Sequence, residues 1–349
     1  MHYSNKQIKE VDLSDMQAQI ASLYNQMEDS VRIINDFKEE NSSYKNIINN
    51  YNKILIIGMG GSAIGADFAR TVIANNLPMP IFVVRDYSIP AWVDKKTFVI
   101  ASSYSGNTEE TLTAYNECLE KGCHSIVIST GGKLSECANR NNVGVVKLPV
   151  GYQPRAAIGY SLSVLLLLFV ELGLAENKIL TDLKQSIDNK LGIKYIEEAK
   201  VIASKLYNTF PVIYSSQGYM EILSVRLKGQ LAENAKILSY YEVFPEHNHN
   251  EIEGWSNSLT DLTSQFSVVW IKDKSDSSYI KKRMEIVENI ISKFPHQQLD
   301  IEVSGDTVLE RVFAMIHLID WTSFYLAILY KNNPSPVDNI KKLKSLMLG

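Results

Sequence analysis

The stretch Lys53–Gly65, KILIIGMGGSAIG, decides the fold. It opens with a run of apolar residues, which is typical of a strand covered on both faces. The run leads through Gly58, Gly60 and Gly61 into a segment of helical composition. Glycines let the backbone approach a ligand closely, and the first turn of a helix presents free N–H groups to an anion. This order therefore predicts an α/β domain with a ligand-binding turn.

Further apolar runs repeat this pattern in the first half of the chain. Strands are expected at Ile81–Arg85, Thr97–Ala101, Ser125–Ser129 and Val143–Leu148. The segments Ala63–Ala74 and Glu109–Lys121 between them have helical patterns. Five strands that alternate with helices predict a parallel sheet wrapped on both sides.

The second half has a similar rhythm. Strands are expected at Phe210–Ser215, Ala235–Tyr240 and Gln265–Ile271, with a weaker one at Leu299–Val303. Helices are expected at Glu221–Gln230, Tyr279–Phe294 and Val308–Tyr330. Two such units predict a duplicated, doubly wound α/β fold. We expect an N-terminal helical segment (1–40), a first domain (41–174), a connection (175–195), a second domain (196–330) and a C-terminal helix (331–349).

Composition limits the function. A chain of 349 residues with 45% hydrophobic and 21% charged residues predicts two globular domains. The net charge of −4 gives no global basic field, so no nucleic-acid partner is expected. Three cysteines argue against a disulfide framework and favour a cytoplasmic setting.

Neither a targeting segment nor a membrane span is expected. The N-terminus carries charges too often for a signal peptide. The most apolar stretch, Ala156–Val170, has fifteen uncharged residues, short of the roughly 20 that a spanning helix needs. It predicts a buried core helix.

The segment Ser102–Thr111, SSYSGNTEET, follows the third expected strand and leads into a helix. It brings the hydroxyls of Ser103, Ser105 and Thr108 beside a glycine and a helix N-terminus. Such a cluster suits a terminal phosphate, whose oxygens accept several hydrogen bonds. The alternative is a helix cap formed by Asn107 or Thr108. A cap explains one or two of these residues but not the whole cluster.

A dinucleotide site is the rival interpretation of the first turn. Gly58-x-Gly60-x-x-Ala63 fits the dinucleotide-binding fingerprint, and Asp86 stands where an acid that binds a ribose would be expected. On these residues alone, the possibility of an NAD-binding oxidoreductase stays open.

Three further residues could carry chemistry. Glu233 could be a general base, or a surface glutamate paired with Lys228 or Lys236. His249 could exchange protons near neutral pH or ligate a metal, or it could belong to a plain surface loop. Arg155 could stabilise a developing negative charge, or mark the exposed end of the apolar helix.

Several motifs occur together in a fixed order. They are GMGGSAIG (58–65), SSYSGNTEET (102–111), PRAA (154–157), LAENAK (231–236) and PEHNHNE (245–251). From about residue 40 to the C-terminus this pattern resembles the bifunctional phosphoglucose/phosphomannose isomerases, which are built from two sugar-isomerase (SIS) domains. The resemblance implies interconversion of glucose 6-phosphate, and mannose 6-phosphate, with fructose 6-phosphate.

The resemblance also implies roles for individual residues. Glu233 would carry the proton between C1 and C2 through a cis-enediol, Arg155 would stabilise its charge, and His249 and Lys344 would assist ring opening. Lys342 is the alternative to Lys344. The phosphate would be bound by Gly61, Ser62, Ser103, Ser105 and Thr108.

No cofactor and no metal are implied. The resemblance implies a homodimer in which His249 reaches the active site of the neighbouring subunit. A noncatalytic SIS protein that senses a sugar phosphate is the alternative. It would need the loop Ser102–Thr111, here called the hydroxyl loop, but not Glu233, His249 and Lys344.

Overall fold

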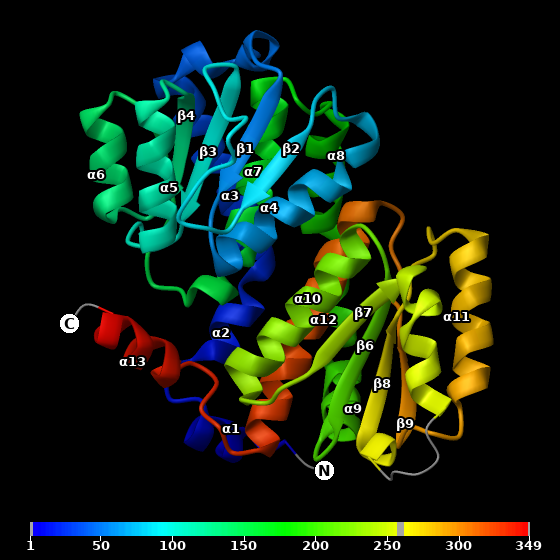
Figure 1. Ribbon diagram of the computed structural model, residues 1–349. Coiled ribbons are helices and arrows are strands. Elements are labelled where there is room, and N and C mark those ends of the chain that lie inside the picture. Colours follow the sequence, from blue (N-terminus) through cyan, green and yellow to red (C-terminus); the bar gives the residue numbers. More distant parts are fainter. Residues whose placement is uncertain (1–2, 257–261, 348–349) are drawn as a thin grey trace. The chain divides into compact units, whose positions relative to one another are not determined.

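The computed structural model describes residues 3–256 and 262–347, which form two compact units (Figure 1). The first unit consists of Ala21–Lys190 with Thr307–Glu310. The second consists of Leu191–Asp306 and Arg311–Gly349 together with the chain up to Ile20. Each unit contains one sheet.

The first sheet has five parallel strands in the order β2-β1-β3-β4-β5. All five expected strands are confirmed: β1 (Lys53–Ile57), β2 (Ile81–Val84), β3 (Thr97–Ser103), β4 (His124–Ser129) and β5 (Gly144–Lys147). Because β1 lies between β2 and β3, the chain winds outward from the middle of the sheet in both directions. This is the doubly wound arrangement that the sequence predicts.

Helices cover both faces of the first sheet. Helices α5 (Glu109–Glu120) and α6 (Gly132–Arg140) pack on one face, where Leu55, Val99 and Val127 point. The right-handed crossover from β1 to β2 places α4 (Gly60–Val72) on the other face. Against α4 lies α7 (Ile158–Leu172), which in turn packs on α3 (Leu23–Glu40).

Helix α7 is the expected core helix. All of its residues except Val170 and Glu171 are buried, so its apolar character is used inside the protein. Helix α8 (Lys178–Asn189) follows it.

The second sheet has four parallel strands in the order β7-β6-β8-β9. Its strands are β6 (Phe210–Ser216), β7 (Tyr240–Phe244), β8 (Phe266–Ile271) and β9 (Gln297–Ile301). Helix α11 (Ser278–Ile291) covers one face, where Tyr214 and Trp270 are buried. The remaining helices are α1 (Asn5–Val11), α2 (Met16–Ala21), α9 (Ile196–Leu206), α10 (Tyr219–Gln230), α12 (Val308–Leu329) and α13 (Asp338–Met347).

The strand expected at Ala235–Tyr240 is wrong. Residues Leu231–Ala235 instead extend α10 by a π-helical turn, and the strand begins only at Tyr240. The apolar pair Ile237–Leu238 suggests a buried strand, but Leu238 is 78% exposed. Lys236 has the left-handed φ of 63°, which an extended strand does not accommodate.

Helix α12 is long and apolar enough to cross a membrane, with 22 residues and a mean hydropathy of 1.7 in its most apolar window. However, 94% of that window is buried inside the protein. A buried core helix has the same composition, so length and hydropathy alone do not make α12 a membrane span.

A buried ion pair holds α12 to the end of β8. The Arg311 guanidinium donates to both carboxylate oxygens of Asp273 at 2.7 and 3.2 Å, and both side chains are 3% exposed. Burial alone would raise the pKa of Asp273, but hydrogen bonds from Arg311 and Ser275 outweigh it and hold the pKa below its usual range. The pair therefore contributes stability above the ordinary carboxyl pKa of about 4, and loses it as the pH falls through the lower folded value.

We predict that Arg311→Met lowers the free energy of unfolding by about 3–5 kcal/mol near neutral pH, because it leaves a buried carboxylate without its cation. The loss should shrink below about pH 4, where Asp273 can protonate. Urea denaturation at several pH values measures this. Arg32→Met, which removes an exposed pair with Asp29, is the control and should leave the free energy of unfolding nearly unchanged. Equal losses in the two variants would contradict the assignment.

Candidate functional site

In the first sheet the strand order changes direction between β1 and β3, which leaves a crevice at the ends of these two strands. Ligands of doubly wound folds bind at this place, beyond the carboxyl ends of the two central strands. Here those strands are β1 and β3, with Ile57 paired to Ala101. A Cβ atom on Gly58 would lie 2.9 Å from the Ser102 carbonyl oxygen. The turn after β1 and the end of β3 are therefore in direct contact.

The hydroxyl loop after β3 is compact. The Ser103 and Thr108 hydroxyls are 2.9 Å apart, and Ser103 is 2% exposed. The exposed Ser105 hydroxyl accepts the Asn107 amide at 3.2 Å. Gly106 turns the chain with a φ of 67°, and its amide donates to the Ser103 carbonyl at 3.0 Å. Ser103, Ser105 and Thr108 thus gather within one turn.

The capping alternative explains little of this loop. Thr108 occupies the N-cap position of α5, but its hydroxyl pairs with Ser103 instead of an amide of the first helical turn. The amides at the start of α5 and the neighbouring hydroxyls are together the kind of donor set that binds a phosphate.

The glycine turn brings Arg155 to the same end of the sheet. Helix α4 begins at Gly60, which has a φ of 51°. A Cβ atom on Gly61 would lie only 2.7 Å from the Pro154 carbonyl oxygen and 3.6 Å from the Arg155 Cα. Gly61 and the buried Ser62 therefore lie against the short 3-10 helix Pro154–Ala156.

Arg155 itself is 5% exposed, so it does not mark an exposed helix end. Its permanent charge is therefore buried, on a segment whose backbone lies beside the turn that begins α4. Asp86 of the dinucleotide hypothesis is exposed, and its carboxylate accepts the adjacent Tyr87 amide at 2.6 Å.

In the second unit, Glu233 lies in the π-helical turn that ends α10. Such wide turns occur frequently at functional sites. The turn is attached to α12, because the buried Asn234 side chain donates to the Ser323 hydroxyl at 2.9 Å. One turn earlier, Gln230 donates to Asp320 at 2.7 Å. Glu233 is half-buried between these fixed neighbours.

The two histidines of the loop after β7 have opposite environments. His247 is fully buried, with its ring stacked on Phe244 at 4.7 Å, and burial lowers its pKa to about 4. His249 is exposed in the 3-10 turn Glu246–His249. Of the two, only His249 is accessible to a substrate.

This loop is fixed by a network that the sequence analysis missed. The Glu251 carboxylate accepts the hydroxyls of Tyr214 at 2.5 Å and Tyr240 at 2.8 Å. The Trp255 indole donates to the Tyr214 hydroxyl at 3.0 Å, and burial raises the pKa of Glu251. The position of Glu251 inside the PEHNHNE motif was the signal that could have found it. Glu251 fastens the chain two residues after His249.

The C-terminal lysines lie on α13. Lys341, Lys342 and Lys344 are all exposed, so burial does not distinguish Lys344 from Lys342. Within residues 3–256 and 262–347, no group of three or more His, Cys, Asp or Glu side chains is arranged to hold a metal ion.

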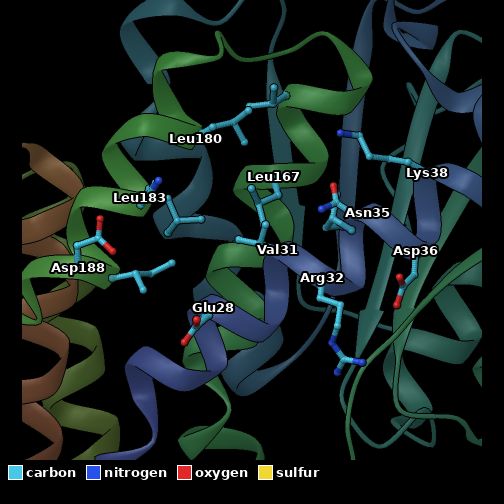
Figure 2. Close-up of a pocket in the computed structure, with 14 residues that line it drawn as sticks. Glu28, Val31, Arg32, Asn35, Asp36, Lys38, Leu167, Leu180, Leu183 and Asp188 are labelled. Atoms are coloured by element: carbon cyan, nitrogen blue, oxygen red, sulfur yellow. The ribbon is translucent and has the colours of Figure 1, made fainter.

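A large hollow of the first unit lies elsewhere. Figure 2 shows it between α3, α7 and α8, with a volume of about 740 Å³. Val31, Leu167 and Leu183 form part of its apolar lining, and charged side chains such as Glu28 and Asp188 also line it. None of its lining residues belongs to the loops after β1 and β3. We therefore place the candidate site at the strand ends and not in this hollow.

Comparison with known proteins first defines the class. Residues 47–170 match the family model of the SIS domain, and residues 196–347 match that of the bacterial phospho-glucose isomerase C-terminal SIS domain. The C-terminal domain of glucosamine-fructose-6-phosphate aminotransferase from Francisella tularensis has the same fold, with a TM-score of 0.72 at 13% identity over 96% of this chain and 98% of that chain. The chain is thus a protein of two SIS domains.

Two curated relatives narrow this class. A bifunctional phosphoglucose/phosphomannose isomerase from Caldicellulosiruptor bescii is 43% identical over 305 residues, which cover 84% of this chain and 88% of the relative. One from Aquifex aeolicus is 36% identical over 296 residues, covering 84% and 90%. This chain belongs to the bifunctional phosphoglucose/phosphomannose isomerase family, which confirms the resemblance drawn from its motifs.

The contact between Gly61 and Pro154 allows a test of the candidate phosphate site, formed by the turn after β1 and the hydroxyl loop after β3. We predict that Gly61→Ala weakens binding of a hexose 6-phosphate at least about tenfold, which corresponds to about 1.4 kcal/mol. The new methyl group would push the start of α4 away from Pro154. Isothermal titration calorimetry measures the affinity.

Gly229→Ala is the matched control, because a Cβ atom there meets nothing within 4 Å. That change should leave the affinity unaltered and, within α10, slightly stabilise the helix. Normal affinity in the Gly61 variant would exclude this turn from the site.

Proposed function

We propose that this protein is an aldose–ketose isomerase that interconverts glucose 6-phosphate, and mannose 6-phosphate, with fructose 6-phosphate. Its membership of the isomerase family is the observation that carries the proposal. That membership favours the isomerase over a noncatalytic sugar-phosphate sensor and over an NAD-binding oxidoreductase. The geometry of the hydroxyl loop supports the same conclusion.

The phosphate of the substrate would bind to the first unit. Ser103 and Thr108 already lie side by side, 2.9 Å apart, at the start of α5. Gly61 and Ser62 would add donors from the start of α4, and Ser105 one from the loop tip. A phosphate held at several points fixes the rest of the sugar, so binding energy is converted into orientation at the reacting carbons.

The reaction moves protons and electrons within one molecule. In the open-chain aldose, the Glu233 carboxylate would take the C2 proton while the aldehyde oxygen gains one, which gives a cis-enediol. The same carboxyl group would return its proton to C1, and loss of the O2 proton would complete the ketose. Arg155 would stabilise the negative charge that develops on the two oxygens.

Hexose phosphates are mostly closed rings, so the ring must open first. We assign this proton exchange to His249 and to a lysine of α13, Lys344 or Lys342. His249 is suited because histidine accepts and donates protons near neutral pH. These roles fall on residues of both units, so the proposal requires that they act on the same substrate molecule.

We predict that Glu233→Gln, which keeps the shape of the side chain and removes the base, lowers kcat at least about 100-fold. Affinity for the sugar phosphate should stay within about threefold, because the phosphate donors are untouched. A coupled assay with fructose 6-phosphate and calorimetry measure the two effects.

Glu285→Gln, an exposed carboxylate on α11, is the control and should keep full activity. Near-normal turnover in the Glu233 variant would remove this residue from the mechanism.

We also propose a homodimer in which His249 serves the active site of the neighbouring subunit. The exposure of His249, on a loop fixed by Glu251, supports this proposal. In such a dimer each site combines Glu233 of one subunit with His249 of the other.

This arrangement predicts complementation. Glu233→Gln and His249→Asn should each be nearly inactive alone, since each removes one required group from both sites. Mixed subunits should regain about a quarter of wild-type activity, because about half of the dimers are mixed and each has one intact site. Unfolding and refolding the two variants together, followed by the coupled assay, measures it. Absence of recovery in verified mixed dimers would place both residues in the same subunit.

A further inference from the structure

Two polar residues of the LAENAK motif have no part in the proposed chemistry. They are Asn234 and Lys236, on either side of the end of the π-helical turn that holds Glu233. Asn234 is buried and bound to Ser323 of α12, which accounts for it. Lys236 is exposed and has a left-handed φ of 63°, an unfavourable conformation for a residue with a side chain. Its own contacts explain why a lysine stands there.

The Lys236 ammonium group lies among three backbone carbonyl groups. It donates to the carbonyl of Glu233, to that of Pro336 at 2.6 Å and to that of Pro334 at 3.5 Å. An ammonium group has three N–H donors and no acceptor, so this arrangement matches its full donor capacity. One side chain thereby links the backbone of Glu233 to the segment before α13.

A second hydrogen bond joins the same two segments. The Asn332 side chain donates to the Ala235 carbonyl at 2.9 Å. Pro334 and Ser335 are buried, so residues 332–336 form a fixed base from which α13 begins.

Helix α13 depends on this base for its position. None of its residues, Asp338–Met347, is buried, so packing along its own length contributes little to holding it. The helix carries Lys342 and Lys344, the candidate ring-opening lysines. Its distance from the Glu233 turn is therefore set by the contacts at residues 332–336.

We propose that Lys236 is a positioning residue, which sets the spacing between the Glu233 turn and the lysines of α13 by holding the carbonyl groups of both segments. This inference rests on the proposed function, since it matters for catalysis only if both segments act on the sugar. The groups for ring opening and for proton transfer are then held at a fixed distance from each other by the Lys236 side chain.

The experiment compares Lys236→Met with wild type. We expect kcat to fall about 10- to 100-fold with KM within about threefold, because a displacement of about 1 Å can cost a factor of 100 while phosphate binding is unaffected. Hydrogen exchange should accelerate at the amides of 338–347 and stay unchanged in α12. Unchanged exchange in α13 would overturn the proposal.

Two further variants test whether the effect is specific to this anchoring. One removes a different lysine, which lies on α10, and the other breaks the second link between the two segments. Lys228→Met removes an exposed lysine of α10 that lies 5.3 Å from the Tyr241 ring centroid, and should leave both readouts unaltered. Asn332→Ala, which breaks the second link, should accelerate exchange in α13 in the same way as the Lys236 variant. If Asn332→Ala leaves α13 unchanged, the anchoring role assigned to residues 332–336 is wrong.

A double-mutant cycle tests whether Lys236 acts through α13. In a background of Lys342→Met and Lys344→Met, adding Lys236→Met should reduce kcat less than about threefold, since the groups it positions are gone. An equal loss in both backgrounds would overturn the proposal. The proposed function fails separately, if the wild-type protein does not turn over fructose 6-phosphate. An inactive Glu233 variant together with unchanged exchange in the Lys236 variant overturns only the present inference.

Discussion

The pairing of β1 with β3 is the constraint on which the candidate site depends. The register sets Ile57, the last residue of β1, opposite Ala101, so the turn after β1 runs beside the last residues of β3. The chain must turn away in opposite directions from these two ends, and so the loops face each other. Gly58 is needed because the Ser102 carbonyl leaves no room for a Cβ atom. Hydroxyls and helix amides then meet as a consequence of strand pairing.

The second sheet has the same doubly wound strand order, but the ends of its central strands carry a different set of polar groups. Its central strands are β6 and β8. At their ends Ser216 donates to Asp276 at 2.5 Å, and Tyr219 donates to Asp273 at 2.9 Å. Asp273 is also held by Arg311. The polar groups here satisfy one another and include carboxylates, which repel an anion. The candidate groups Glu233 and His249 of this unit lie instead in the chain that flanks β7, the turn before it and the loop after it.

Local patterns were enough to predict the strands of the first sheet and the hydroxyl loop, because apolar runs and a serine-rich turn are contiguous in the chain. The π-helical turn at Leu231–Ala235 was not predictable in this way. It depends on Ser323 and Asn332, which lie about a hundred residues away in sequence. The same applies to Glu251, whose partners are tyrosines of two different strands. Within a motif, residues that hold a site in place look the same in sequence as residues that contact a ligand. Only their partners, which are distant in sequence, distinguish the two kinds.

The net charge of the chain requires that the proposed phosphate site attract its ligand through nearby groups. With a net charge of −4, the chain as a whole does not attract an anionic sugar phosphate. In the proposed function, binding would therefore come from donors at short range. The first unit offers neutral ones, the hydroxyls of Ser103 and Thr108 and the amides that begin α4 and α5. Arg155, whose backbone lies against the turn that begins α4, adds a cation, and it is buried. A buried charge is weakly screened, so its field acts on the reacting oxygens more than on the solvent. Under this proposal a negatively charged protein would bind a dianion because the attraction is confined to the site of the reaction.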